Sequence, residues 1–387
     1  MAKELFVITE DHLNTGLRGF PVGTVRTSKV DPEKGVSYVG YPIRELVDLD
    51  PEQVMYLLLN KDLPTPEEDK KFREELKKRS VLPEGVMDFL KTFPKQGHPM
   101  EWFMGGLLAL GMFGKVEDYK EDGLNLLARV PQIVAAIFRL REGWGDPIPP
   151  RDDLGYVENF VHMLDVPGGS EHLPEVMRLF HILHMDHGGG NLSTFTGKAV
   201  ASGLADIYAS MAAAMAGLYG PRHGRANQDC LRFVQELESD DDDYVRSFIQ
   251  KKLENKELIY GFGHAVLRAE DPRAAVQYDV AARLFPEDEN VRKALKLRKI
   301  AVEVLKQVPK IANPYPNVDA VSGSLLHASG LKKPEYYTVL FGFSRVVGIT
   351  AQIIDERLYF RNGKGVPIYR CKYLPENQPE RHLEKKG

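Results

Sequence analysis

The sequence predicts an all-α protein, with a large multi-helical domain, a smaller helical domain and minor β-hairpins near the termini. Two observations predict this class. Apolar residues recur every three or four positions through most of the 387-residue chain, as they do on the buried face of a helix. Strand-like alternation is confined to the two ends, and strands nowhere alternate with helices as they would in a parallel sheet.

Capping residues mark the first expected helices. Asp50 precedes Pro51, and a proline is well tolerated at the first helical position because its nitrogen needs no partner there. Thr65 and Glu68 have the spacing of a capping box. The same apolar period predicts helices in four later segments, residues 82–93, 153–164, 175–187 and 338–357.

Two hairpins are expected at the edges of this helical core. Residues 20–41 contain the turn sequence DPEKG between short alternating runs, and residues 358–374 contain NGKG. The acidic run at 236–244 is typical of a solvated loop or a helix cap, since nothing in the sequence folds it around a cation.

Composition excludes several classes of protein. The net charge of −4 gives no broad attraction for nucleic acid or an anionic membrane. The two cysteines, Cys230 and Cys371, are too few for a disulfide framework or a cysteine metal site. The most membrane-like segment, residues 207–220, is shorter than the ~20 residues that cross a bilayer, and the N-terminus has no apolar signal core. We expect a cytoplasmic protein, or one of the mitochondrial matrix if a transit peptide was removed.

The stretch HILHMDHGGGNLS, residues 181–193, contains three histidines at three-residue spacing, followed by three glycines. His181, His184 and His187 would share one face of a helix that ends just past His187, where three glycines follow. A metal site on this face is disfavoured, because the outer two histidines lie too far round the helix and no fourth ligand is apparent. Either the segment is a core-facing helix end, or the glycines leave His187 and bare backbone open to a ligand.

Two further histidines also lie beside glycines. His223 is in GPRHGRANQD, where a surface loop before a helix is the alternative to a functional turn. His264 is in IYGFGHAVLRAEDPR, whose glycines allow a close approach of the backbone. The same stretch holds Arg268 and Arg273, which would bind a ligand with several negative charges unless they form a solvated basic face.

A carboxylate and a buried charge complete the candidate chemistry. Asp319 follows two prolines and opens a small, apolar helix, so it is either an N-cap or a general base with a raised pKa. Arg345 lies within FGFSRVVG, and a charge among apolar residues should be paired or functional because burying it alone is costly. This inventory favours a small polyanionic substrate that undergoes proton transfer at carbon. The sequence contains no GxSxG motif, so a serine hydrolase is disfavoured.

Five motifs then appear in the order and spacing of the citrate synthase family: HMDHGGGNLSTFT, GPRHGRANQ, GFGHAVLRAEDPR, PNVDAVSG and LFGFSR. The chain resembles the form of that family in which the first motif ends in Gly-Gly-Asn. The resemblance implies an almost wholly helical homodimer whose active sites are completed by the partner chain. Residues 1–219 and 326–387 would form the large domain, and residues 220–325 a small domain that binds CoA and moves on closure.

The resemblance also implies a reaction, in which a Si-type citrate synthase condenses acetyl-CoA with oxaloacetate and hydrolyses citryl-CoA to citrate and CoA. By motif, Asp319 would take a proton from the thioester methyl group. His223 would hydrogen-bond the carbonyl oxygen that becomes enolic, and His264 would polarise the oxaloacetate carbonyl. The residues implied for binding oxaloacetate are His187, Arg273, Arg345 and, from the partner subunit, Arg370, with Arg361 as the competitor for the last role.

No tightly bound cofactor and no metal are implied, because acetyl-CoA is a co-substrate. The residues implied for CoA are Leu258, Ile259, Gly261, Gly263, Arg268 and, from the partner subunit, Arg141. Neither nucleic acid nor a membrane is an expected partner.

Some positions depart from the family pattern. Gly188 stands where this form usually has Glu, and Arg222 and Arg225 flank His223 where apolar residues are usual. If unpaired, the two arginines would disfavour the imidazolium form of His223. A 2-methylcitrate synthase that uses propionyl-CoA shares the catalytic set and remains an alternative, as does, more remotely, a catalytically silent CoA-binding regulator.

Overall fold

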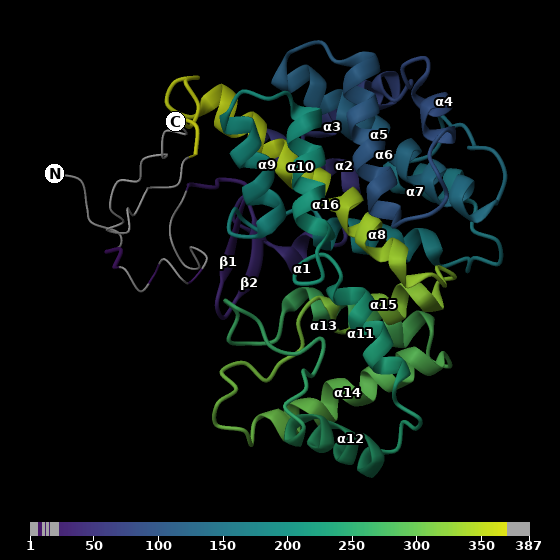
Figure 1. The fold of residues 1–387 in the computed structure, drawn as a ribbon, viewed down its shortest axis with the longest axis vertical. Helices are drawn as coiled ribbons and strands as arrows, with labels where there is room; N and C mark the ends of the chain where they lie inside the picture. Colours follow the sequence, from purple (N-terminus) through teal and green to yellow (C-terminus); the bar gives the residue numbers. More distant parts are fainter. Residues whose placement is uncertain (1–6, 10–11, 13–14, 16–22, 370–387) are drawn as a thin grey trace, which may run out of the picture.

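Residues 7–9, 12, 15 and 23–369 are described by the computed structural model. Helices make up most of this part of the chain, which confirms the predicted all-α class. Figure 1 shows them in two unequal groups, a larger one at the top and a smaller one, drawn in green, at the bottom.

The larger group is built from both halves of the chain around one central helix. Its α-helices are α1 (Ile43–Leu46), α2 (Pro51–Asn60), α3 (Pro66–Arg79), α4 (Val86–Lys91), α5 (Pro99–Gly114), α6 (Tyr119–Glu142), α7 (Tyr156–Leu164), α8 (Leu173–His184), α9 (Leu192–Ser202), α10 (Ile207–Tyr219) and α16 (Tyr337–Ile354). A 3-10 helix, η2 (Pro334–Tyr336), precedes α16, and a π-helix, η3 (Asp355–Tyr359), follows it. Every residue of α16 except Phe341 is buried, so this helix is the core of the group.

The smaller group is continuous in sequence. Its helices are α11 (Ala226–Gln235), α12 (Asp242–Glu254), α13 (Pro272–Leu284), α14 (Glu289–Leu305) and α15 (Asp319–Ala328). Both α13 and α15 contact α8 of the larger group, so the two groups meet along these helices.

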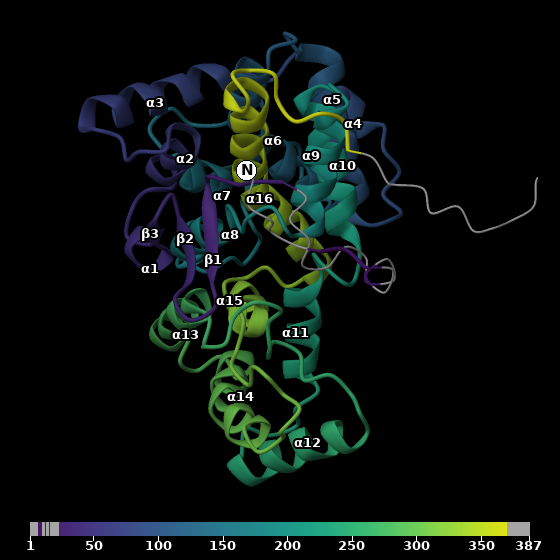
Figure 2. The same cartoon turned by 90° about the vertical axis from the view of Figure 1, so that its left-hand side faces the viewer.

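The predicted N-terminal hairpin is confirmed over its described residues. Strands β1 (Ser28–Asp31), β2 (Gly35–Tyr38) and β3 (Tyr41–Pro42) form an antiparallel sheet in that order. Figure 2 shows β1 running from the larger group towards α13. At the hairpin turn, the Pro32 carbonyl accepts a hydrogen bond of 2.7 Å from the backbone nitrogen of Arg268, so the sheet touches the smaller group.

The predicted caps are confirmed. Thr65 accepts a hydrogen bond from the backbone of Glu68, whose carboxylate accepts one of 2.9 Å from the backbone of Thr65. Asp50 precedes α2, and Asp241 of the acidic run caps α12.

Two expectations about the apolar segments are wrong. No strand forms between 358 and 369, the described part of the expected C-terminal hairpin, because α16 continues into η3 and the NGKG turn follows directly. Residues 207–220 are also not the most membrane-like segment. Within the described chain, α6 and the run Pro334–Tyr359 are longer apolar segments. Of the 18 most apolar consecutive residues in each, 78% and 94% are buried inside the protein, as in core helices.

Candidate active site

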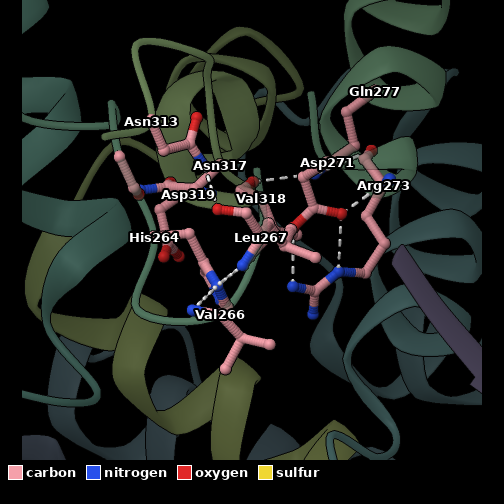
Figure 3. A network of polar contacts seen from close by, with 11 residues as sticks. His264, Val266, Leu267, Asp271, Arg273, Gln277, Asn313, Asn317, Val318 and Asp319 are labelled. Carbon is pink, nitrogen blue, oxygen red and sulfur yellow. Dashed lines mark hydrogen bonds and ion pairs between the residues drawn. The ribbon is translucent and has the colours of Figure 1, made fainter. Parts of the chain in front are cut away.

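Asp319 is the first residue of α15, and Val318 occupies the cap position, so the N-cap alternative is excluded. Asn317 holds Asp319 beside the loop that carries His264. The side-chain oxygen of Asn317 accepts from the backbone nitrogen of Asp319, and its amide nitrogen donates to the carbonyl of Gly263, each at 3.0 Å. Figure 3 shows Asp319 and His264 close together on these adjoining segments.

Desolvation raises the pKa of the Asp319 carboxyl to about 6. The guanidiniums of Arg273 and Arg345 act in the opposite direction but do not outweigh it. A carboxylate with this pKa is mostly ionised at neutral pH and is still basic enough to accept a proton in catalysis. The other Asp319 alternative, a general base, therefore fits its environment.

The ring of His264 is fixed in one tautomer by its own loop. Its Nδ1 accepts hydrogen bonds of 3.0 Å from the backbone nitrogens of both Val266 and Leu267 (Figure 3). Desolvation and the charge of Arg273 lower the pKa of His264, which favours the neutral ring. Because Nδ1 is an acceptor, the single proton of that ring lies on Nε2, which can donate to a substrate oxygen.

The glycines before His264 bring this loop against α15. Gly261 and Gly263 have φ values of +83° and +85°, which favour glycine. A Cβ on Gly261 would lie 2.7 Å from the Cα of Ala320, so the close approach predicted from the sequence is to the chain's own α15. The two glycines therefore help to bring His264 and Asp319 together.

Arg273 lies in a buried ion pair that the sequence analysis missed. Its Nε and Nη2 donate to the two carboxylate oxygens of Asp271 at 3.1 and 2.7 Å, and Asp271 also caps α13 (Figure 3). The two side chains are 2% and 0% exposed. Asp271 fixes the guanidinium edge-on and leaves Nη1 for another anion. The signal was present in EDPR, where an acid stands two residues before the arginine.

Arg345 confirms the expectation of a charge within an apolar helix. It is 2% exposed, its Nε donates to the carbonyl of His184 at 3.0 Å, and its guanidinium lies 4.7 Å from the centre of the Phe341 ring. Desolvation lowers its pKa to about 10, so it stays charged at neutral pH. Among the described residues no carboxylate lies within the 4.0 Å of an ion pair with Arg345, and the buried Asp186 carboxylate acts on it only at longer range.

His187 does not lie on the helix face predicted for it. Helix α8 ends at His184, three residues earlier than the glycines predicted. His181 is buried between the rings of Tyr156 and Phe343, while His187 lies beyond the helix with its ring centre 5.6 Å from that of His264. The Nε2 atom of His187 is buried and has no hydrogen-bond partner in the described structure. Within that same part of the chain, no group of three His, Cys, Asp or Glu residues could hold a metal ion.

His223 lies in the loop before α11, with its Nε2 3.0 Å from the Ser193 hydroxyl. Desolvation and then the charge of Arg345 lower its pKa to about 4. The expectation that Arg222 and Arg225 supply this effect is therefore wrong. Arg222 is exposed, and Arg225 lies 3.9 Å from the Asp229 carboxylate.

The residues expected to bind CoA have varied surroundings. Leu258 is 70% exposed, whereas Ile259 packs on the core. Arg268 is exposed, and its Nη1 turns back on the carbonyl oxygens of residues 264–267. Arg141 donates to the Gly97 carbonyl at 2.8 Å, and its guanidinium lies 5.6 Å from the centre of the Trp102 ring.

Of the two arginines considered for the partner-subunit role, Arg361 lies among the described residues. Arg361 donates through Nη1 to the carbonyl of Gly365 at 3.2 Å. Arg370, like Cys371, lies outside the described residues.

The family profile described as "Citrate synthase, C-terminal domain" matches residues 16–372. The chain belongs to the citrate synthase family. It is 35% identical to citrate synthase 4, mitochondrial, of Arabidopsis thaliana, over 98% of this chain and 84% of the relative. It is 37% identical to the mitochondrial citrate synthase of Xiphias gladius, over 95% and 83% of the two chains.

Solved citrate synthases share the fold. The structure from Thermotoga maritima superposes with a TM-score of 0.79 at 30% identity, over 95% of this chain and 99% of the other. The enzyme from Thermoplasma acidophilum, a ternary complex with carboxymethyl coenzyme A and oxaloacetate, gives 0.82 at 25% identity, over 96% and 97%. Membership of the citrate synthase family makes this chain an enzyme of the acyltransferase class.

Proposed function

We propose that this chain is a Si-type citrate synthase, which condenses acetyl-CoA with oxaloacetate and hydrolyses citryl-CoA to citrate and CoA. One observation carries the proposal. A carboxyl group with a pKa of about 6, Asp319, lies beside a histidine, His264, whose proton is on Nε2, and two buried arginines lie nearby. This combination provides a base, a donor and a binding site for a dianion.

Oxaloacetate supplies carboxylates for the two buried arginines. Its carboxylates pair with Arg345, which has no carboxylate partner of its own among the described residues, and with the free edge of Arg273. The unpartnered Nε2 of His187 donates to an oxaloacetate oxygen. The Thermoplasma acidophilum enzyme, solved with carboxymethyl coenzyme A and oxaloacetate bound, supports this substrate pair.

The chemistry requires a base and two donors acting together. Asp319 removes a proton from the methyl group of acetyl-CoA, which is too weak an acid for a carboxylate alone. His223, kept neutral by desolvation and oriented by Ser193, hydrogen-bonds the thioester oxygen as it becomes enolic. His264 donates from Nε2 to the oxaloacetate carbonyl that the enol carbon attacks.

The complete site requires a second copy of the chain and a moving small domain. In the proposal, Arg370 of the partner subunit contacts oxaloacetate and Arg141 of the partner subunit contacts CoA. Residues 220–325, which include α11 to α14 and most of α15, close over bound oxaloacetate and expel water. The residues that bind CoA within the subunit are Leu258, Ile259, Gly261, Gly263 and Arg268.

The names of the relatives bear on two open choices. Six of this chain's relatives are named as mitochondrial citrate synthases, which favours the mitochondrial matrix over the cytoplasm expected from the sequence. The same names favour acetyl-CoA over propionyl-CoA as the substrate, and hence citrate over 2-methylcitrate as the product.

The test follows release of free thiol from acetyl-CoA and from propionyl-CoA, with and without oxaloacetate. We expect oxaloacetate-dependent release with acetyl-CoA preferred, reduced about 10²–10⁴-fold in Asp319→Asn. A preference for propionyl-CoA would make the chain a methylcitrate synthase. No release from either thioester would leave a silent CoA-binding protein and overturn the proposal.

A further inference from the structure

The end of helix α8 is set by a residue on another element. In a continuing helix, the backbone nitrogen of Asp186 would donate to the carbonyl of Ile182, four residues earlier. Instead, the Tyr38 hydroxyl from strand β2 is the hydrogen-bond partner of both groups. It donates to the Ile182 carbonyl at 2.9 Å and accepts from the Asp186 nitrogen at 3.2 Å. A side chain inserted into the helical ladder in this way bends or ends the helix.

The neighbouring groups stabilise the same break. The carbonyl of His184 accepts from Arg345 at 3.0 Å, and that of Met185 accepts from the backbone nitrogen of Gly348 at 3.1 Å. Each of these carbonyls at the end of α8 therefore has a partner outside its own helix. The helix stops because other elements satisfy its last hydrogen bonds.

The break decides where His187 points. His187 follows Asp186 directly, and its backbone nitrogen donates to the Asp186 carboxylate at 2.8 Å. Had the helix continued, His187 would lie one turn beyond His184, in line with the buried His181 and His184. Because the helix is broken, the His187 ring faces His264 across the site.

We propose that Tyr38 is a positioning residue for oxaloacetate, which breaks α8 so that His187 faces the bound substrate. This inference rests on the proposed function. Tyr38 is fully buried and so is held in place. Its hydroxyl is also close enough to Arg273 and Arg345 for both cations to lower its pKa, against the larger raising effect of desolvation. The hydroxyl therefore lies at the oxaloacetate end of the site.

The variant Tyr38→Phe removes the hydroxyl and keeps the ring. The Asp186 nitrogen then loses its acceptor and is free to rebuild the helical bond to Ile182, which rotates His187 away from the substrate. We expect KM for oxaloacetate to rise about tenfold. KM for acetyl-CoA should change by less than about twofold, because no CoA-binding residue moves.

Tyr337→Phe is the matched control. Tyr337 is also fully buried, and its hydroxyl donates to the Leu331 carbonyl at 2.7 Å, outside the site. Both variants should lose thermal stability, but only Tyr38→Phe should lose affinity for oxaloacetate. Equal KM values for oxaloacetate in the two variants and the wild type would overturn the inference.

The outcomes separate the two proposals. If the wild type shows no oxaloacetate-dependent thiol release, the proposed function fails, and the inference fails with it. If the wild type is active and Tyr38→Phe is unchanged, only the positioning role fails. Should Tyr38→Phe not fold, hydrogen exchange of the wild-type peptide 182–187 decides, since slow exchange of the Asp186 amide is expected and rapid exchange would contradict its bond to Tyr38.

Discussion

Asp319 and Arg345 are each held in a protonation state that costs stability. Asp319 is ionised although desolvation raises its pKa, and Arg345 is charged although desolvation lowers its pKa. Such groups persist in folded proteins where a substrate or a reaction uses them. The buried pair of Arg273 and Asp271 shows the ordinary alternative, in which a cation already has a carboxylate partner.

The pH dependence of turnover should report Asp319. The base must be ionised, and its pKa is about 6, so kcat at saturating substrate should fall about tenfold per pH unit below that value. Desolvation lowers the pKa of His223 to about 4, well below this range, and it also lowers the pKa of His264. A profile that stays flat down to pH 5, measured by thiol release, would contradict the assigned base.

His181 should be a destabilising residue. Neither ring nitrogen of this buried side chain has a hydrogen-bond partner in the described structure, and desolvation lowers its pKa to about 3. The unfolded chain takes up the proton near pH 6.5, so the folded state loses stability as pH falls from 6.5 towards 3. His181→Leu should raise the free energy of unfolding by about 1–3 kcal/mol at pH 8, and by more at pH 5. Calorimetry showing a lower Tm at both pH values would contradict this.

At the scale of elements, sequence patterns correctly predicted those features that depend on residues close together in the chain. The caps at Asp50 and Thr65 and the helix containing Arg345 depend on residues a few positions apart, and the sequence displays them directly. The end of α8 was mispredicted because it depends on Tyr38, which precedes Ile182 by 144 residues. No periodicity in residues 175–187 carries that information.

The prediction of a C-terminal hairpin was wrong for a related reason. The NGKG segment does turn, with positive φ at Arg361, Asn362 and Gly363. The residues before it, however, continue from α16 as the π-helix η3, where Glu356 and Arg357 are buried. The turn signal was correct, whereas the strands that it was expected to join depended on packing that the sequence pattern does not show.

The β1–β2 turn should matter to the site through Gly35. A Cβ at this residue, which has φ +82°, would lie 2.4 Å from Pro272, immediately before Arg273. Gly40 has a similar φ of +92° with nothing within 4 Å of a Cβ, so Gly40→Ala is the matched control. Both variants should cost about 1–2 kcal/mol of stability. Only Gly35→Ala should also raise KM for oxaloacetate, and equal KM values would show that this turn does not support Arg273.

At the scale of the whole molecule, the two helix groups divide the proposed work. Asp319 and His264 belong to the segment around the smaller group, whereas His187 and Arg345 belong to the larger one. Because α13 and α15 meet α8 between the groups, a relative movement of the groups would assemble or open the site. The predicted domain boundaries at 220 and 325 came only from the family resemblance, since no linker in the sequence marks them.

The proposed partner arginine can be tested with mixed dimers. We expect Arg370→Ala and Asp319→Asn each to be inactive as separate proteins. Co-expressed and purified through two different tags, the hybrid should regain about half of the wild-type activity, because one of its two sites is then complete. Arg361→Ala, expected to retain activity alone, is the control. A hybrid as inactive as its parents would show that Arg370 does not act across the subunit interface.

The fate of the acetyl methyl carbon tests most directly whether a carbon–carbon bond forms with Asp319 as the base. The protein would be incubated with [2-¹³C]acetyl-CoA and oxaloacetate, and the products followed by NMR. We expect the label to appear in a methylene group of citrate, and Asp319→Asn to slow its appearance about 10²–10⁴-fold. Label recovered as acetate would show simple thioester hydrolysis and would contradict carbon–carbon bond formation.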